Sequence, residues 1–308
     1  MKAIMYHYVQ EFNEKLPYFH YLNIKNFEKQ IIYFKSKYEF FDCNDIENFS
    51  ESSKIRNKIL LTFDDGLICH SKYVLKVLQK YNLNGIFYIP TGPYLDGKIL
   101  DVHKIHLIIG KIGGLKAFNL LQTYIDNSFL DLNKVEEYEK HTYKLQVNSD
   151  YINSFKRILN YYIKYEFRED LVNRLFGKCF NESEKNIIKR YYMSITDIKN
   201  LYSSGMVIGS HAVKHKLMSR LPEKSFKQEI DDSFNFLNDF INYKTFCYPY
   251  GGDISFNNKI EKYLDKNLVE FSLSVESRNI TKNDLKFRRQ ALPRFDCNQF
   301  KYGQIDIV

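Results

Sequence analysis

Two adjacent carboxylates, Asp64 and Asp65, directly follow a compact apolar run at 58–63. A buried strand that stops at two acids and a glycine presents carboxylates at the edge of a sheet. Neighbouring side chains at the end of a strand point in different directions, so one could bind a metal ion while the other accepts a proton. In the alternative interpretation, the two acids form a turn and cap the helix that follows.

Two histidines, His211 and His215, follow a second strand-like run at 205–209. A spacing of four would place both imidazoles on one face of a helical turn, which suits a divalent metal ion. Taken alone, the pair could also be surface or capping histidines. Two histidines and one carboxylate are a frequent ligand set for catalytic zinc, with one position left open for water. The second carboxylate could then serve as general base.

The order of the surrounding elements is that of an α/β protein. Apolar runs that predict strands alternate with segments of helical spacing, and this order predicts parallel crossovers in one sheet. The polar residues above follow predicted strands, where α/β proteins gather their active sites. The predicted strands include 2–8, 58–63, 85–90, 205–209 and 245–248, and the predicted helices include 27–38, 71–81 and 225–240.

The character of the chain changes between residues 98 and 190. Turn signals become scarce, proline is absent, and apolar residues recur at helical spacing. We therefore predict one domain formed by 1–97 and 191–308, interrupted by a mostly helical insertion at 98–190. The insertion could be a lid, a substrate-binding cap or the contact of a homo-oligomer.

Composition narrows the class of protein. The chain of 308 residues is 44% hydrophobic and 27% charged, as in ordinary globular proteins. Its net charge of +8 could favour an anionic partner or reflect a lysine-rich surface, and without a continuous basic run we expect no nucleic-acid partner. The five cysteines include no Cys-x-x-Cys pair, which suits a reducing compartment. We see no signal peptide and no transmembrane segment, and we expect a cytoplasmic protein.

Three short segments carry the residues described above. The segment 62–66 reads Thr-Phe-Asp-Asp-Gly, the segment 210–215 reads Ser-His-Ala-Val-Lys-His, and the segment 248–251 reads Tyr-Pro-Tyr-Gly. Together they resemble the signatures of the polysaccharide deacetylases of the NodB-homology group, also called carbohydrate esterase family 4-like. Segments 6–7, 205–209 and 292–296 match at the flanks, so the resemblance covers roughly 1–95 and 195–300.

The resemblance implies a distorted (β/α) barrel, usually with seven strands, and a divalent ion on Asp65, His211 and His215. Zinc is the expected ion, with cobalt and nickel as alternatives. Asp64 would be the general base that takes a proton from metal-bound water as this water attacks the amide carbonyl. By the same analogy, the backbone N–H of Tyr250 would stabilise the oxyanion together with the metal.

The sequence departs from the family at two positions. Many members have an arginine at the position of Cys247, where it steadies the catalytic aspartate. Arg294 is our candidate replacement, although it could also be an ordinary surface arginine.

Many members also use a late histidine as general acid, but no histidine follows His215 here. His7 at the end of the first predicted strand, and His103 and His106 at the entry to the insertion, are the candidates for this role. Asp64 could instead act as both base and acid.

The resemblance implies a hydrolase that removes an N-acyl group, acetyl or formyl, from an amino sugar. We expect a cytoplasmic nucleotide-linked or lipid-linked intermediate of surface polysaccharide synthesis as its substrate. The alternative is a carbohydrate-binding or scaffolding pseudo-enzyme on a degenerate deacetylase fold, which the two missing groups would favour.

Overall fold

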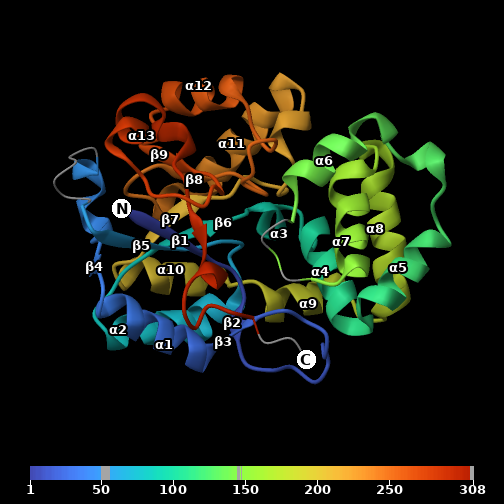
Figure 1. Ribbon diagram of the computed structural model, residues 1–308, viewed down its shortest axis with the longest axis horizontal. Helices are drawn as coiled ribbons and strands as arrows, with labels where there is room; N and C mark the ends of the chain where they lie inside the picture. The colour runs from blue at the N-terminus through green and yellow to red at the C-terminus, as the bar shows by residue number, and fades with distance from the viewer. Residues whose placement is uncertain (50–55, 144–145, 147, 306–308) are drawn as a thin grey trace. The chain divides into compact units, whose positions relative to one another are not determined.

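The computed structural model describes residues 1–49, 56–143, 146 and 148–305 (Figure 1). The chain forms two compact units. Unit 1 comprises Met1–Glu11, Tyr21–Gly97 and the described residues from Ile188 onward, and unit 2 comprises Phe12–His20 and Lys98–Ile187. The assignment of 98–190 to a separate insertion remains a prediction, and the segment Phe12–His20 of unit 2 lies outside it.

Unit 1 is built on a curled parallel sheet. Seven strands follow one another in the order β10-β1-β5-β6-β7-β8-β9, and β4 pairs with the first residues of β5 as an eighth. Every strand pair recorded in the described residues is parallel, as the alternation of strands and helices predicted. The strands are β1 (Lys2–Tyr6), β4 (Glu39–Phe40), β5 (Lys58–Phe63), β6 (Ile86–Ile89), β7 (Val207–Ser210), β8 (Thr245–Cys247), β9 (Phe271–Leu273) and β10 (Phe295–Asp296), with a separate pair β2 (Val9–Gln10) and β3 (Leu22–Asn23).

One segment near the end of the chain joins the two edges of this sheet. Leu292 forms a parallel bridge with Leu273 of β9, and three residues later β10 begins to pair with β1, at Phe295 and Ile4. Arg294 lies between these two contacts. Arg294 therefore belongs to the segment that joins the two edges of the curled sheet.

The two faces of the strands fill different cores, because successive side chains of a strand point to opposite faces. On β5, Leu61 and Phe63 belong to a core cluster that also contains residues of the helices α1 and α10, whereas Leu60 belongs to another. The cluster of Leu60 contains residues of β1, β6, β7, β8 and β9, and it therefore fills the inner face of the curled sheet.

The helices of unit 1 cover the sheet, with α1, α2 and α10 labelled on one side and α11, α12 and α13 on the other in Figure 1. Ser194 and Asp197 form a capping box that begins α10. The helices are α1 (Ile24–Lys35), α2 (Leu75–Lys80), α3 (Gly92–Leu95), α10 (Ile195–Ser203), α11 (Glu223–Leu237), α12 (Asn258–Lys266) and α13 (Lys282–Phe287). A π-helical turn at His70–Val74 precedes α2, so the predicted helix at 71–81 is not uniform.

Unit 2 is mostly helical. A partly buried ion pair between Arg168 and Asp101, 2.6 Å apart, joins α8 to the first turn of α4. Its helices are α4 (Asp101–Ile112), α5 (Gly114–Gln122), α6 (Val135–His141), α7 (Asp150–Arg157) and α8 (Tyr165–Cys179), and α9 (Glu184–Tyr191) begins in unit 2 and ends in unit 1.

None of the helices in the described part of the chain combines the length and the apolar character needed to span a lipid bilayer.

Candidate active site

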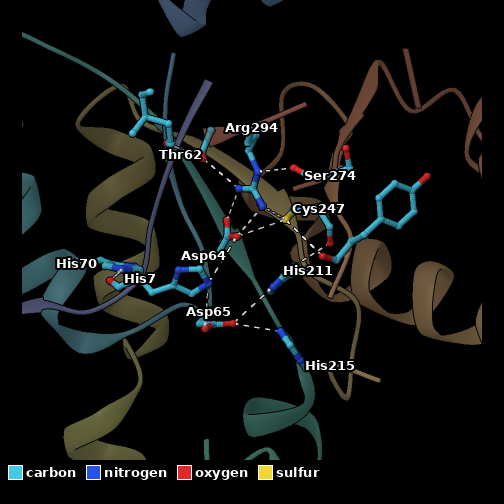
Figure 2. Close-up of polar contacts among 12 residues, drawn as sticks. His7, Thr62, Asp64, Asp65, His70, His211, His215, Cys247, Ser274 and Arg294 are labelled. Atoms are coloured by element: carbon cyan, nitrogen blue, oxygen red, sulfur yellow. Dashed lines mark hydrogen bonds and ion pairs between the residues drawn. The ribbon is translucent and has the colours of Figure 1, made fainter. Parts of the chain in front are cut away.

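Asp64 and Asp65 lie directly after β5, at the carboxyl end of the sheet. The amide of Asp64 still donates to the carbonyl of Tyr6 on β1, at 2.9 Å. Asp65 and Gly66 then adopt left-handed backbone angles, with φ of 79° and 60°. The chain therefore turns sharply at the end of the strand, and the two carboxylates reach different neighbours (Figure 2).

Asp65, His211 and His215 converge on one point, and all three residues are buried. Oδ1 of Asp65 lies 3.5 Å from Nε2 of His211 and 3.6 Å from Nε2 of His215. Ligand atoms about 2.1 Å from a tetrahedral ion would lie roughly 3.4 Å apart. The donor set of two imidazoles and one carboxylate therefore fits a zinc-like ion in both chemistry and spacing.

The surroundings of His211 also suit a cation. Its Nδ1 lies 2.7 Å from the carbonyl oxygen of Cys247. When Nδ1 carries the hydrogen and donates it to this carbonyl, the lone pair of Nε2 points towards Asp65. Burial lowers the pKa of His211, but neighbours that include Cys247 and Asp65 raise it more, and its pKa lies well above the ordinary value. These neighbours therefore favour a cation at Nε2 of His211, which can be a proton or a metal ion.

The predicted helical turn at the two histidines is wrong. Residues 211–215 form a loop after β7, and Ala212 and His215 have positive φ angles of 60° and 50°. A helix cannot contain such angles for these residue types. The two rings nevertheless lie 4.8 Å apart, because the loop folds His215 back towards His211.

Asp64 pairs with Arg294, and its carboxylate also lies near His211, with which it and Cys247 form a second group of possible metal ligands. Arg294 donates from Nη1 to Oδ1 and from Nη2 to Oδ2 of Asp64, each at 2.8 Å, and both side chains are almost fully buried. The same guanidinium donates to Thr62 Oγ1 and to the carbonyl of Ser274. Burial would raise the pKa of Asp64, but the charge and hydrogen bonds of Arg294 lower it to about 2.

Cys247 lies beside this ion pair. Its Sγ is 2.9 Å from Nη2 of Arg294 and 3.5 Å from Oδ2 of Asp64, so the side chain packs against both partners. In the sequence, Cys247 is notable only as the residue at the position where many members of the resembled family have an arginine. No signal in the sequence indicated that the thiol would contact both groups.

His7 is the candidate proton donor that unit 1 supplies. It follows β1, its side chain is about one third exposed, and its Nε2 lies 3.9 Å from one oxygen of Asp64 and 3.9 Å from one of Asp65. His103 and His106 lie in α4 of the other compact unit. Of these three histidines, His7 is the one that belongs to unit 1, and it lies beside both carboxylates.

The backbone of His7 is held by His70, a residue that the sequence analysis did not select. Nε2 of His70 lies 2.8 Å from the carbonyl oxygen of His7. Burial lowers the pKa of His70 to about 4, so the ring is neutral at pH 7 and donates from Nε2–H. Its ring packs edge-on against the stacked rings of Phe63 and Phe87, which helps to fix the place where the chain leaves β1.

Tyr250 lies in the turn after β8, with a φ of 65°. Its ring packs edge-on against His215, with centroids 4.9 Å apart. The third signature segment therefore contacts the second one at the candidate ligand set.

Comparison with protein families matches part of the chain. Residues 180–271 match the family model of the polysaccharide deacetylases, a range that contains both histidines but not the two aspartates. Comparison with curated proteins gives no match.

Solved structures share the fold. The deacetylase PplD of Streptococcus pyogenes, in complex with acetate, is similar with a TM-score of 0.59 at 12% identity, over 96% of this chain and 91% of that one. BC0361, a polysaccharide deacetylase from Bacillus cereus, gives a TM-score of 0.53 at 15% identity. The match covers 96% of this chain but only 64% of BC0361, so this chain corresponds to part of that protein.

The fold is a curled parallel sheet with surrounding helices, and the predicted distorted (β/α) barrel of the NodB-homology type is confirmed. The chain is therefore similar to the polysaccharide deacetylases, in the family model over residues 180–271 and in the fold over most of its length. These similarities support a deacetylase-type amidohydrolase.

Proposed function

We propose that this protein hydrolyses the N-acyl group of an amino sugar with the help of a divalent metal ion. The observation that carries the proposal is the convergence of Asp65, His211 and His215 beside a second carboxylate that is clamped by an arginine. A site that only bound a carbohydrate would have no need for an ionised aspartate next to three buried metal-ligand side chains. This arrangement therefore favours catalysis over a scaffolding role.

Asp65, His211 and His215 would hold the ion, which we expect to be zinc. When bound there, the ion would polarise the acyl carbonyl and lower the pKa of a coordinated water molecule.

Asp64 is assigned as the general base. Because its pKa is lowered to about 2, the carboxylate is ionised at neutral pH and can accept a proton from the attacking water. The same low pKa makes Asp64 a weak base, so it would pass the proton on quickly. His7, with its Nε2 3.9 Å from Asp64, is placed to take part in delivering a proton to the leaving amine.

Arg294 and Tyr250 have supporting roles in this proposal. Arg294 holds both oxygens of Asp64 and so fixes the direction in which the base accepts its proton. The backbone N–H of Tyr250 would donate to the oxyanion that forms on the acyl oxygen. The contact of its ring with His215 supports a position next to the reacting carbonyl.

For the substrate, we propose a nucleotide-linked or lipid-linked N-acyl amino sugar in the cytoplasm, on the route to a surface polysaccharide. The net charge of +8 supports a phosphorylated carrier. An acetyl group is supported by the similar deacetylase that was solved with acetate.

The test is product analysis by mass spectrometry. Zinc-loaded protein would be incubated with UDP-linked N-acetylhexosamine, with the free sugar and with chitin oligomers, and the D65N variant would serve as control. We expect loss of one acetyl group from the UDP-linked sugar with wild-type protein only. Activity confined to chitin-like polymers would refute the proposed carrier, and no deacetylation of any substrate would refute the enzymatic function.

A further inference from the structure

Glu229 is a buried acid at a position where the amphipathic pattern of α11 calls for an apolar residue. The buried stripe of this helix contains Phe226, Ile230, Phe234 and Leu237, and Glu229 lies within it with only 8% of its surface exposed. Burying a carboxylate is costly unless it is hydrogen-bonded. The contacts of this side chain therefore indicate why an acid occupies the position.

The carboxylate of Glu229 binds the loop that carries both histidines. Its Oε2 accepts hydrogen bonds from the backbone amides of Val213, at 2.9 Å, and of Lys214, at 2.7 Å. These are two of the three residues between His211 and His215. Successive backbone N–H groups in such a turn form a concave anion site, and here a side chain of the same protein fills it.

The loop is also fixed from its other side. The amides of Thr91 and Gly92 donate to the carbonyls of Ala212 and Val213, at 3.1 and 2.8 Å. The left-handed angles of Ala212 and His215 cost free energy, so the surrounding hydrogen bonds must hold the loop in this shape. Glu229 is the charged group that accepts from the loop amides.

We propose that Glu229 is a positioning residue for the metal centre, which sets the distance between the imidazoles of His211 and His215 through the loop amides. This inference rests on the proposed function, because it requires that the two histidines bind a metal ion. Loss of the carboxylate would release the amides of Val213 and Lys214 and allow His215 to move away from His211.

The test is the zinc affinity of the full-length protein, prepared metal-free and titrated against a chromophoric chelator. We expect E229A to bind zinc about 10- to 100-fold more weakly, the usual effect of removing a group that orients metal ligands. E229Q keeps one neutral acceptor oxygen, and we expect a smaller loss, because hydrogen bonds to a charged acceptor are about twice as strong.

Glu261 on α12 provides a matched control. It is also 8% exposed, but its carboxylate pairs with Arg288, away from the histidine loop. E261A and E261Q should bind zinc as the wild type does. Thermal unfolding of each variant identifies the variants that fold. If E229A does not fold, the zinc affinity of E229Q compared with that of E261Q tests the role of Glu229.

The outcomes separate the two proposals. Wild-type affinity in E229A and E229Q, with zinc binding lost in H215A, would overturn the role of Glu229. Equally reduced affinity in the Glu261 variants would also overturn it, since any buried acid would then have the same effect. No zinc binding by the wild type would instead refute the metal centre itself.

Discussion

Arg294 donates two parallel hydrogen bonds to Asp64, each 2.8 Å long, across 230 positions of the sequence. The pair is buried, with side-chain exposures of 1% and 2%. Bidentate pairs of this kind are strong and geometrically specific. The arginine reaches Asp64 because the segment around Leu292 pairs with β9 just before β10 pairs with β1.

The first prediction concerns stability and pH in the variant R294M. Removing one partner of a buried ion pair costs about 3–5 kcal/mol in the free energy of unfolding, because a buried charge loses its partner. Without Arg294, burial raises the pKa of Asp64, and the acid limb of the pH–rate profile should move to higher pH. Denaturant unfolding and kcat/KM as a function of pH measure the two effects.

The pH dependence of the free energy of unfolding follows from the difference between the folded and unfolded pKa of Asp64. In the wild type the pKa of Asp64, about 2, lies below the unfolded value of about 3.9, so its contribution to stability is present above pH 5 and is lost between about pH 4 and 2. In R294M, the free energy of unfolding should not show this decrease between about pH 4 and 2. Unchanged stability and an unchanged pH–rate profile would show that the pair does not control Asp64.

The second prediction concerns the variant D64N. An amide cannot accept the proton of the attacking water, so the rate of deacylation should fall by about 10²–10⁴-fold. Zinc content should stay unchanged, because Asp64 faces Arg294 and is not one of the three proposed ligands. Full activity of D64N would show that the assignment of the base is wrong.

The third prediction concerns the proton donor. H7Q should lower kcat about 10²-fold or more, with little effect on KM, if His7 delivers a proton in the rate-limiting step. The matched control is H106Q on α4, which should retain wild-type kinetics. The reverse result would move the donor to unit 2, and wild-type kinetics in both variants would leave Asp64 as both base and acid.

The fourth prediction concerns the metal ligands. H211A, H215A and D65N should each lose zinc measured by elemental analysis, since three protein ligands with an open position are the minimum of a catalytic zinc site. A chelator should likewise remove activity from the wild type, and zinc, cobalt or nickel should restore it. Zinc retained at one ion per chain in all three variants would place the metal elsewhere.

The strands next to the site could be predicted from the sequence, because an apolar run that ends at polar residues is typical of a buried strand and its end. The strand predicted at 58–63 agrees with β5, and the two aspartates lie at its end. The contact of Arg294 with Asp64 was anticipated only as a candidate, through resemblance to a family. Spacing alone could not indicate it, because sheet curvature brings the two residues together.

The conformation of the histidine loop could not be predicted from spacing. A separation of four residues suits a helix, but positive φ angles at Ala212 and His215 place the rings together in a different way. The group that holds this loop comes from another segment, where Glu229 interrupts the apolar stripe of the helix predicted at 225–240. Amphipathic spacing identifies such a helix, but it does not identify which backbone amides the buried acid will bind.

The role of unit 2 is also beyond what helical spacing can predict. The pattern indicated helices between 98 and 190, and α4 to α8 are present there. A lid, a cap or a homo-oligomer contact would each require the same amphipathic helices. The choice among them depends on partners, and size-exclusion chromatography with light scattering would measure the oligomeric state directly.

The central claim is that Asp65, His211 and His215 bind one metal ion that is required to remove an acyl group from an amino sugar. Its most direct measurement is acetate release from UDP-linked N-acetylhexosamine by metal-free protein, titrated with zinc. The account predicts that activity rises to a plateau at one zinc ion per chain and stays absent in H215A. Acetate release that is independent of added zinc, or equal in H215A, would contradict it.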